Sequence, residues 1–273
     1  MHFYPNQLEH VICFSGGICS YIAAKRVIAE TGQAKTILLY CDTKAEDPDT
    51  DRFLCQAQQF LRVPLIRLAD GRTPWEVFMS ERMLGSSRAD PCSRILKRRL
   101  ARRWIRDHCD PNTTTIYLGL SWYEKHRIEA NTKAWQPWRT DYPTCRRPLL
   151  DLDDMLAEAI QDGITPPRLY ALGFAHNNCG GFCVKQGHAA MRHYLAVFPH
   201  QFRQHEAREL EFQARTGKPV TIMRDLKPNT GEPLTLRDFR LRCEVNAIPH
   251  PAEDSHDCAC MLIADGDNDT DDD

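Results

Sequence analysis

Blocks of apolar and polar residues alternate along the first half of the chain. Four short apolar runs, typical of buried strands, lie at residues 10–14, 36–43, 63–70 and 113–122. The segments between them carry apolar residues at helical spacing and predict helices over residues 21–30, 47–61, 73–84 and 93–108. Strands that alternate with helices predict an α/β fold, a parallel sheet flanked by helices on both faces.

The second half of the chain has a different pattern. Proline-rich punctuation near residues 147–167 precedes a segment dense in Cys, Gly and His, and a long polar helix is predicted near Phe202 to Arg215. We therefore predict a nucleotide-binding α/β domain over residues 1–175 and a Cys-rich, helical C-terminal extension over residues 176–264. Residues 265–273 contain no apolar side chain, and we expect them to form a disordered acidic tail.

Composition narrows the class of protein. The 273 residues are 42% hydrophobic and 26% charged, which is ordinary for a folded domain and excludes wholesale disorder or a coiled coil. No run of roughly 18 apolar residues is present, and the N-terminus lacks a signal-peptide pattern. We expect a cytoplasmic protein without a membrane segment. Twelve cysteines in such a protein indicate thiolate chemistry or metal ligation rather than a disulfide framework.

The segment SGGICS, Ser15 to Ser20, follows the first predicted strand and opens the first helix. A helix N-terminus favours an anion, and Gly16 and Gly17 let the backbone approach a phosphate closely. A glycine-containing turn without a ligand is the alternative, and SGG alone would favour it. The chain has neither GxxxxGK[ST] nor GxGxxG, so the ordinary P-loop and dinucleotide motifs are absent.

These residues resemble the signature SGGxDS of the PP-loop ATP pyrophosphatases. CDTKAEDPDTDRF, which follows the second strand, resembles the DTGxxxPETxxF segment of phosphoadenylyl-sulfate (PAPS) reductases and their relatives. RRPLLDLDDMLAEAIQDGITPPRLYALGFAHNNCGGFC is similar to their PLIDWxxxDV and PxxPLYxxGxxxxxCxxC layout. The resemblance covers about residues 10–190 and implies the PP-loop, adenine nucleotide alpha hydrolase-like fold. One position departs from the pattern, because Cys19 replaces the aspartate of the signature.

The resemblance implies that ATP is attacked at its α-phosphate with loss of pyrophosphate, with magnesium as cofactor. It assigns ATP binding to Ser15, Gly16, Gly17, Ile18, Cys19, Ser20, Asp42, Thr43 and Gly119. LGLSWYEKHR, from Leu118 to Arg127, resembles the family's GxRxxES segment and would place Glu124, His126 and Arg127 at the substrate. The implied catalytic residues are Ser15, Gly17, Ser20, Asp42, Glu124 and Arg127. For Glu124, a solvated carboxylate at a helix start is an equal alternative.

A set of cysteines forms the second candidate site. Cys179 and Cys183 flank two glycines that allow a tight turn, and Cys92 lies 87 residues upstream. The arrangement resembles PP-loop proteins in which cysteines hold a [4Fe-4S] cluster, with zinc as the simpler alternative. The predicted metal ligands are Cys92, Cys179, Cys183 and Cys260, with Cys258 and Cys145 as other candidates for the fourth. His176 and His188 are ligands, donors or structural residues. We expect burial for Cys13, Cys41 and Cys55.

The predicted helix over residues 93–108 is strongly basic. Eight basic residues lie between Arg88 and Arg106, and without the six aspartates of the last nine residues the net charge of -2 becomes +4. An apolar stripe of Leu96, Leu100 and Trp104 would leave Lys97, Arg98 and Arg102 to project beside the site. There they would contact a nucleic acid or another anion. A solvated helix face is the alternative.

The family layout, the cysteines and the basic helix together predict an ATP pyrophosphatase that activates a nucleic-acid phosphate or base for sulfur incorporation. DNA phosphorothioate modification is the preferred reaction, with DNA favoured over tRNA, a cysteine desulfurase as sulfur donor and other modification-system subunits as partners. The alternatives are a PAPS or adenylyl-sulfate reductase, a tRNA thiolation enzyme, and a non-catalytic nucleic-acid-binding subunit. A homodimer is one of the oligomeric states left open.

Overall fold

A computed structural model describes residues 8–225 and 231–245. Its centre is a five-stranded sheet in which all neighbouring strands are parallel. The strands in spatial order are β3 (Leu65–Ala69), β2 (Thr36–Asp42), β1 (His10–Cys13), β4 (Thr115–Leu118) and β5 (Arg139–Asp141). The order reverses direction at β1, so the chain leaves β1 and β4 toward opposite sides of the sheet. Ligands of parallel sheets bind at such a switch point, beyond the carboxyl ends of the strands.

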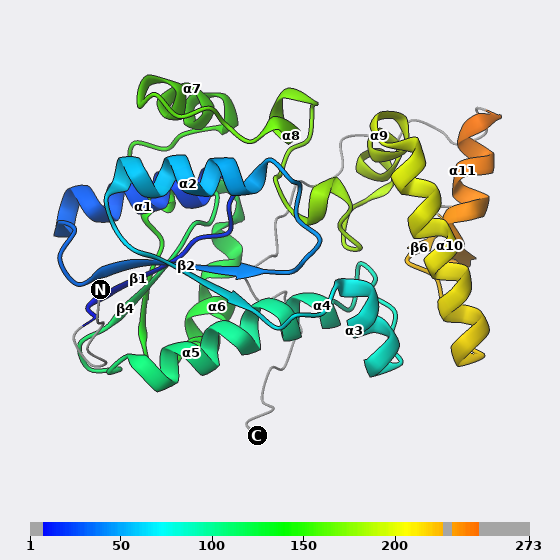
Figure 1. Ribbon diagram of the computed structural model, residues 1–273, viewed down its shortest axis with the longest axis horizontal. Helices are drawn as coiled ribbons and strands as arrows, with labels where there is room; N and C mark the ends of the chain where they lie inside the picture. The colour runs from blue at the N-terminus through cyan, green and yellow to red at the C-terminus, as the bar shows by residue number, and fades with distance from the viewer. Residues whose placement is uncertain (1–7, 226–230, 246–273) are drawn as a thin grey trace.

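Helices cover both faces of the sheet, as predicted (Figure 1). One face packs against α1 (Ile18–Thr31) and α2 (Thr50–Leu61), and α7 (Leu152–Gln161) packs against α1 on the side away from the sheet (Figure 1). The other packs against α5 (Leu100–His108) and the start of α6 (Ile128–Ala134). The protein is therefore an α/β protein with a parallel sheet between two helical layers.

The strand sequences explain why both faces are covered. In β1, Ile12 belongs to the core cluster of the α1 face, whereas Val11 and Cys13 belong to the cluster of the α5 face. Every residue of β2 is buried. A parallel strand that is apolar on both sides can be stable only between two layers, and the continuous apolar runs of the sequence reflect this.

The C-terminal part builds a third core beside one end of the sheet (Figure 1). Its elements are α8 (Arg168–Ala171), η4 (Cys179–Gly181), α9 (His188–Val197), α10 (Pro199–Thr216), the hairpin of β6 (Met223–Arg224) and β7 (Pro233–Leu234), and α11 (Leu236–Glu244). Trp75 and Phe78 of α3 (Pro74–Glu81) belong to the same cluster. The third core therefore joins the extension to the α/β unit through α3.

Three local features differ from the sequence expectations. Helix α1 begins at Ile18, inside the predicted loop, and the short strand β5 was not predicted. The basic segment is not one regular helix: α4 (Pro91–Ser93) leads into a π-helical turn, η1 (Arg94–Arg99), before α5 begins. Cys55 was expected to be buried, but it lies on the exposed face of α2, whereas Cys13 and Cys41 are buried as expected.

Two short 3₁₀ helices complete the described chain, η2 (Trp122–Arg127) and η3 (Pro143–Cys145). Among residues 8–225 and 231–245, no helix has the length and apolar character needed to cross a bilayer. The predicted acidic tail, residues 265–273, lies outside the described residues.

Candidate functional site

The loop Ser15 to Ser20 lies between β1 and α1, with Gly17 as the helix N-cap. Gly16 has a φ of 80°, which favours glycine, and Gly17 provides no side chain to cap the helix. The hydroxyl of Ser20 donates to the Gly17 carbonyl at 2.7 Å, and that of Ser15 donates to Ser20 Oγ at 3.2 Å. A glycine-capped helix N-terminus flanked by two hydroxyls is chemically suited to phosphate.

Gly119, at the end of β4, is a steric requirement of this loop. A Cβ atom at Gly119 would lie 2.8 Å from Ser20 Cα, 2.9 Å from Ser20 N and 3.0 Å from the Cys19 carbonyl oxygen. All three are backbone atoms, which cannot rotate away. The strand end therefore supports the first turn of α1 directly, and the predicted role of Gly119 in ATP binding stays a prediction.

Asn177 is a residue of this site that the sequence analysis missed. Its side chain is 2% exposed, and its Nδ2 donates to the Gly16 carbonyl at 2.9 Å and to Thr50 Oγ1 at 3.1 Å. The bond to a carbonyl fixes the orientation of the amide, so Oδ1 is the remaining atom. No donor among the described residues reaches this buried Oδ1. A buried acceptor without a donor is costly, and it suits a site that a ligand completes.

Tyr170 contacts the same loop from α8. Its hydroxyl accepts a hydrogen bond from Ile18 N at 3.0 Å, and a Cβ atom at Gly17 would lie 3.3 Å from that oxygen. Two side chains from the segment after α7 therefore hold the loop, although they lie more than 150 residues away in the sequence.

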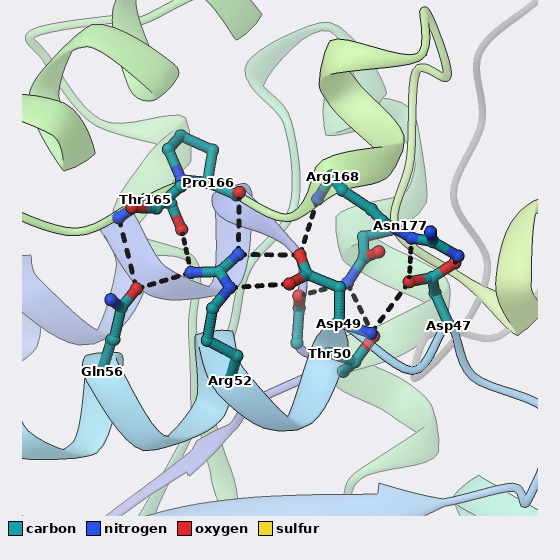
Figure 2. A network of polar contacts seen from close by, with 10 residues as sticks. Asp47, Asp49, Thr50, Arg52, Gln56, Thr165, Pro166, Arg168 and Asn177 are labelled. Carbon is teal, nitrogen blue, oxygen red and sulfur yellow. Dashed lines mark hydrogen bonds and ion pairs between the residues drawn. The ribbon is translucent and has the colours of Figure 1, made fainter.

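A polar network fixes that segment to the start of α2 (Figure 2). The carboxylate of Asp49 accepts two bonds from Arg52, at 2.6 and 2.7 Å, and one from Arg168 N at 2.8 Å. Arg52 also donates to the carbonyls of Thr165 and Pro166, and Arg168 pairs with the buried Asp47 at 2.8 Å. These bonds anchor residues 165–168, which precede Tyr170.

The end of β2 supplies Asp42 and Thr43, as predicted. Asp42 accepts bonds from the backbone and ammonium nitrogens of Lys44, both at 2.8 Å. Partial burial opposes ionisation of Asp42, but these bonds prevail and hold its pKa below the usual value. The carboxylate is therefore charged at neutral pH, as a magnesium ligand must be.

Glu46 connects this strand end to the cysteines. It accepts a bond from Thr43 Oγ1 at 2.9 Å through one oxygen and from Cys179 N at 2.7 Å through the other. The ammonium of Lys97 lies 3.3 Å from Glu46 Oε1, and both side chains are less than 10% exposed. The β2–α2 loop and the cysteine turn thus share one buried ion pair.

Three of the predicted metal ligands meet at a single pocket. Cys92, Cys179 and Cys183 all line a pocket of about 380 Å³ between the β2–α2 loop, α3 and α10. Cys179 has a φ of 49°, and the glycines that follow it also have positive φ, so the backbone turns tightly there. The structure brings these three cysteines together, although Cys92 is distant from the other two in the sequence.

Burial raises the pKa of the Cys92 thiol to about 12, and the neighbouring Cys183 adds to the effect. Burial likewise raises the pKa of Cys179 well above its usual value, whereas the charge of Lys97 lowers it. Both are protonated at neutral pH unless a metal binds, since a coordinating thiol is deprotonated by the ion. Within the described part of the chain, no three His, Cys, Asp or Glu side chains are grouped closely enough for one metal ion. A cluster differs, because each sulfur binds a different iron.

The other proposed ligands separate from this pocket. Cys145 donates to the carbonyl of Leu120 at 3.2 Å and belongs to the core on the α5 face. His188 Nε2 donates to the Arg224 carbonyl at 2.8 Å, which is a structural role. Cys258 and Cys260 lie outside the described residues, so the predicted fourth ligand is not placed.

Lys97 and Arg98 do not project beside the site, and this expectation is wrong. Lys97 is 4% exposed and pairs with Glu46, whereas Arg98 is 1% exposed and pairs with the buried Asp90 at 3.1 Å. The cause is the π-helical turn, whose wider repeat rotates both side chains away from the surface expected for an α-helix. Arg102 also has internal contacts, since it donates to the Ala134 carbonyl and lies over the Trp135 ring.

Glu124 is likewise not a solvated carboxylate, since it is 2% exposed. It accepts a bond from Arg127 at 2.8 Å and one from Ser121 N at 3.2 Å, which closes the first turn of η2. Arg127 is buried too. The pair fixes Ser121, whose hydroxyl lies 4.0 Å from Cys19 Sγ. Cys19 is therefore at the interface between the Ser15 to Ser20 loop and the β4 end.

Comparisons with known proteins give distant structural likenesses. No protein-family model matches the chain, and no curated protein matches it. The chain is similar to phosphoadenylyl-sulfate (PAPS) reductase from Candida auris in a phosphate complex, with 15% identity and a TM-score of 0.42 over 63% of this chain and 79% of that one. It is also similar to the U34-tRNA thiolase NcsA from Methanococcus maripaludis with its [4Fe-4S] cluster, with 13% identity and a TM-score of 0.43 over 78% and 72%.

Proposed function

We propose that this protein is a PP-loop ATP pyrophosphatase that cleaves ATP to AMP and pyrophosphate. A single arrangement carries the proposal: the Gly16–Gly17 loop caps α1 at the switch point of the sheet, and a buried Asn177 oxygen beside it lacks a donor. In the proposed reaction, an acceptor oxygen attacks the α-phosphate and pyrophosphate leaves. Donors aimed at the developing phosphate charge lower the barrier to this step.

The residues take separate roles in this proposal. The backbone of the loop and the hydroxyls of Ser15 and Ser20 bind the phosphates, and Asp42 holds the magnesium ion. Glu124 and Arg127 act as positioning residues, because both are buried and bonded to each other. They support the β4 end against which the loop packs.

Sulfur incorporation is the second part of the proposal. The outer sulfur of a persulfide from a cysteine desulfurase would displace AMP from the activated acceptor, and a thiol reductant would then cleave the resulting S–S bond to leave the sulfur on the acceptor. We propose that the acceptor is DNA in a phosphorothioate modification system with further subunits. The support is the sequence resemblance together with the three cysteines beside the nucleotide loop. Because Lys97 and Arg98 are buried, they do not support nucleic-acid binding by the basic segment. The exposed basic residues of that segment are Arg88, Arg99, Arg103 and Arg106.

The donor set of the pocket fits an iron-sulfur cluster. Cys92, Cys179 and Cys183 would hold it, and the buried ammonium of Lys97 would offset part of the negative charge of the thiolates. When bound, a [4Fe-4S] cluster supplies thiophilic iron. A single zinc ion suits the site less well, because in the described residues these three sulfurs are not grouped closely enough to bind one ion.

Pyrophosphate and AMP release tests the first part. Anaerobically purified protein is given ATP and magnesium, alone and with DNA or tRNA. Ser20→Ala should weaken ATP binding by about tenfold or more, because a hydrogen bond to a charged group contributes about 1.5–3 kcal/mol. Ser87→Ala, an exposed serine outside the site, is the matched control. Unchanged ATP affinity in Ser20→Ala would remove the loop from the proposal, and stimulation by tRNA alone would replace DNA as the acceptor.

Iron and acid-labile sulfide content tests the cysteine site. We expect the wild type to contain both, and Cys179→Ser to lose them. Cys55→Ser is the matched control, because Cys55 is exposed on α2 and does not line the pocket. Zinc without sulfide in the wild type would replace the cluster with a zinc site.

A further inference from the structure

The cysteine pocket has a second wall that the proposed ATP chemistry does not use. Besides the three cysteines, its lining includes aromatic rings from α3, the cysteine turn and α10, here called the aromatic wall. Its volume of about 380 Å³ lies in the range of small-ligand sites. Residues 15–20 are not among its lining residues, but Lys44 and Glu46 are, so the pocket borders the end of β2 where Asp42 and Thr43 lie.

Three planar groups on this wall are held rigidly. Trp75 Nε1 donates to His205 Nδ1 at 2.9 Å, and the rings of Phe182 and His205 stack with centroids 3.7 Å apart and planes 2° apart. Trp75 also lies against His205, at 6.0 Å between ring centroids. A preformed stack of this kind binds flat ligands with little loss of side-chain entropy.

The hydrogen bond from Trp75 also fixes the proton of His205. Since Nδ1 accepts, a neutral ring carries its hydrogen on Nε2. Burial, together with the charge of Arg208, lowers the pKa of His205 to about 3, so the ring is neutral at physiological pH. The wall therefore offers an uncharged donor, which suits a carbonyl or ring nitrogen better than a phosphate.

Polar side chains at the pocket add hydrogen-bonding groups and positive charge. Gln201 and Gln204 line it from α10, and each amide can donate and accept, as the edge of a nucleobase requires. Arg208 lies one turn beyond Gln204 and is exposed. Arg168 also lines the pocket but is paired with Asp47. Arg208 is thus the group best suited to a phosphate attached to a bound base.

We propose that this aromatic pocket binds the base of the acceptor nucleotide beside the three cysteines, with Arg208 contacting its phosphate. The ligand chemistry is a planar base that carries a phosphate, from either a nucleic-acid strand or a free nucleotide. This inference rests on the proposed function and specifies its acceptor site. Aromatic stacking binds bases of any sequence, and sequence selection then falls to partner subunits.

Binding without turnover tests the proposal. Anaerobic protein is saturated with α,β-methylene ATP, so that the nucleotide loop is filled and no pyrophosphate can leave. Fluorescence anisotropy then measures binding of a single-stranded DNA of about 12 nucleotides and of the same strand made of abasic sites. We expect the strand with bases to bind about tenfold more tightly, because one stacked base is worth about that factor. Mononucleotides and ribose 5-phosphate, measured by calorimetry, separate a free-nucleotide source from a strand.

Two arginines of α10 provide matched variants. Arg208→Ala should weaken strand binding by about tenfold through the lost phosphate contact. Arg203→Ala removes an exposed arginine from the same helix that does not line the pocket, and it should change binding by less than about twofold. Gln204→Ala should alter the relative affinity for the four mononucleotides more than it alters ribose 5-phosphate binding.

Four outcomes would overturn this assignment. Equal losses in Arg208→Ala and Arg203→Ala would indicate diffuse surface charge. Equal binding of abasic and normal strands would show that the pocket binds only the phosphate. If the ATP analogue prevents mononucleotides from binding, the pocket is part of the ATP site. Absence of binding to any strand or mononucleotide would also refute it. ATP affinity and pyrophosphate release, measured in parallel on the wild type, report separately on the proposed function.

Discussion

The buried pair of Glu46 and Lys97 gives a quantitative prediction. Their side chains are 8% and 6% exposed and lie 3.3 Å apart, and Glu46 also holds Thr43 and Cys179 N. Removing one partner of a buried pair leaves an uncompensated charge and costs about 3–5 kcal/mol. We therefore expect Glu46→Gln and Lys97→Met each to lower the free energy of unfolding by about this amount.

The double variant decides whether the two residues act together. If they do, Glu46→Gln with Lys97→Met should be more stable than the sum of the single losses predicts, with an interaction energy of about 2–3 kcal/mol. Urea unfolding of the anaerobic protein, followed by circular dichroism, measures all four members of the cycle. The exposed pair of Lys35 and Glu9 is the control, and Lys35→Met should cost less than about 1 kcal/mol. Additivity within about 0.5 kcal/mol would refute the coupling.

Three further predictions follow from the site and the extension. Gly119→Ala should weaken ATP binding by about tenfold or more, because overpacking against backbone costs about 1–3 kcal/mol. The control is Gly163→Ala, which lies in open space at a positive φ and should affect stability alone. Calorimetry measures the ATP affinity of both variants. Asn177→Leu removes the donor to the Gly16 carbonyl and should lower ATP affinity with little effect on the iron content. Burial raises the pKa of Glu209 to about 7, so its folded form binds more protons than the unfolded form between pH 4.5 and 7. The free energy of unfolding should therefore fall by about 3 kcal/mol as pH rises through that window. Urea unfolding at a series of pH values measures this dependence, and the same dependence of stability on pH in Glu209→Gln would contradict the prediction.

The sheet was predictable because local patterns determine it. The apolar runs of β1 and β2 are long enough to be recognised, and burial on both faces leaves them without polar alternation. The position of the Ser15 to Ser20 loop follows from the strand before it and the helix after it. Only the first turn of α1 differs, because the glycine N-cap lies within the motif itself.

The basic segment was not predictable from periodicity. An apolar stripe counted at the α-helical repeat predicts the wrong buried face where the chain forms a π-helical turn. The sequence of residues 94–99 contains no pattern that predicts that turn. The partners that bury Lys97 and Arg98 are Glu46, from a distant loop, and Asp90. Such pairing depends on tertiary structure, and the sequence alone suggested solvent or nucleic acid instead.

Long-range contacts also explain what the sequence missed at the Ser15 to Ser20 loop. Asn177 lies two residues before Cys179, and no sequence motif marked it as a functional residue. Its contact with Gly16 crosses 161 positions and depends on the network that fixes residues 165–168 to α2. The convergence of Cys92 with Cys179 and Cys183 was expected only from the family resemblance, because spacing within one chain does not specify distance in space.

The most direct test of the central claim is the identity of the labelled product formed from ATP that carries ³²P at its α-phosphate. The anaerobic protein is incubated with this ATP, magnesium and DNA, and the products are separated by chromatography. The account predicts labelled AMP, released either directly or after the adenylyl group has first been transferred to the acceptor, together with unlabelled pyrophosphate. Labelled ADP with release of inorganic phosphate would show attack at the γ-phosphate and would contradict the account.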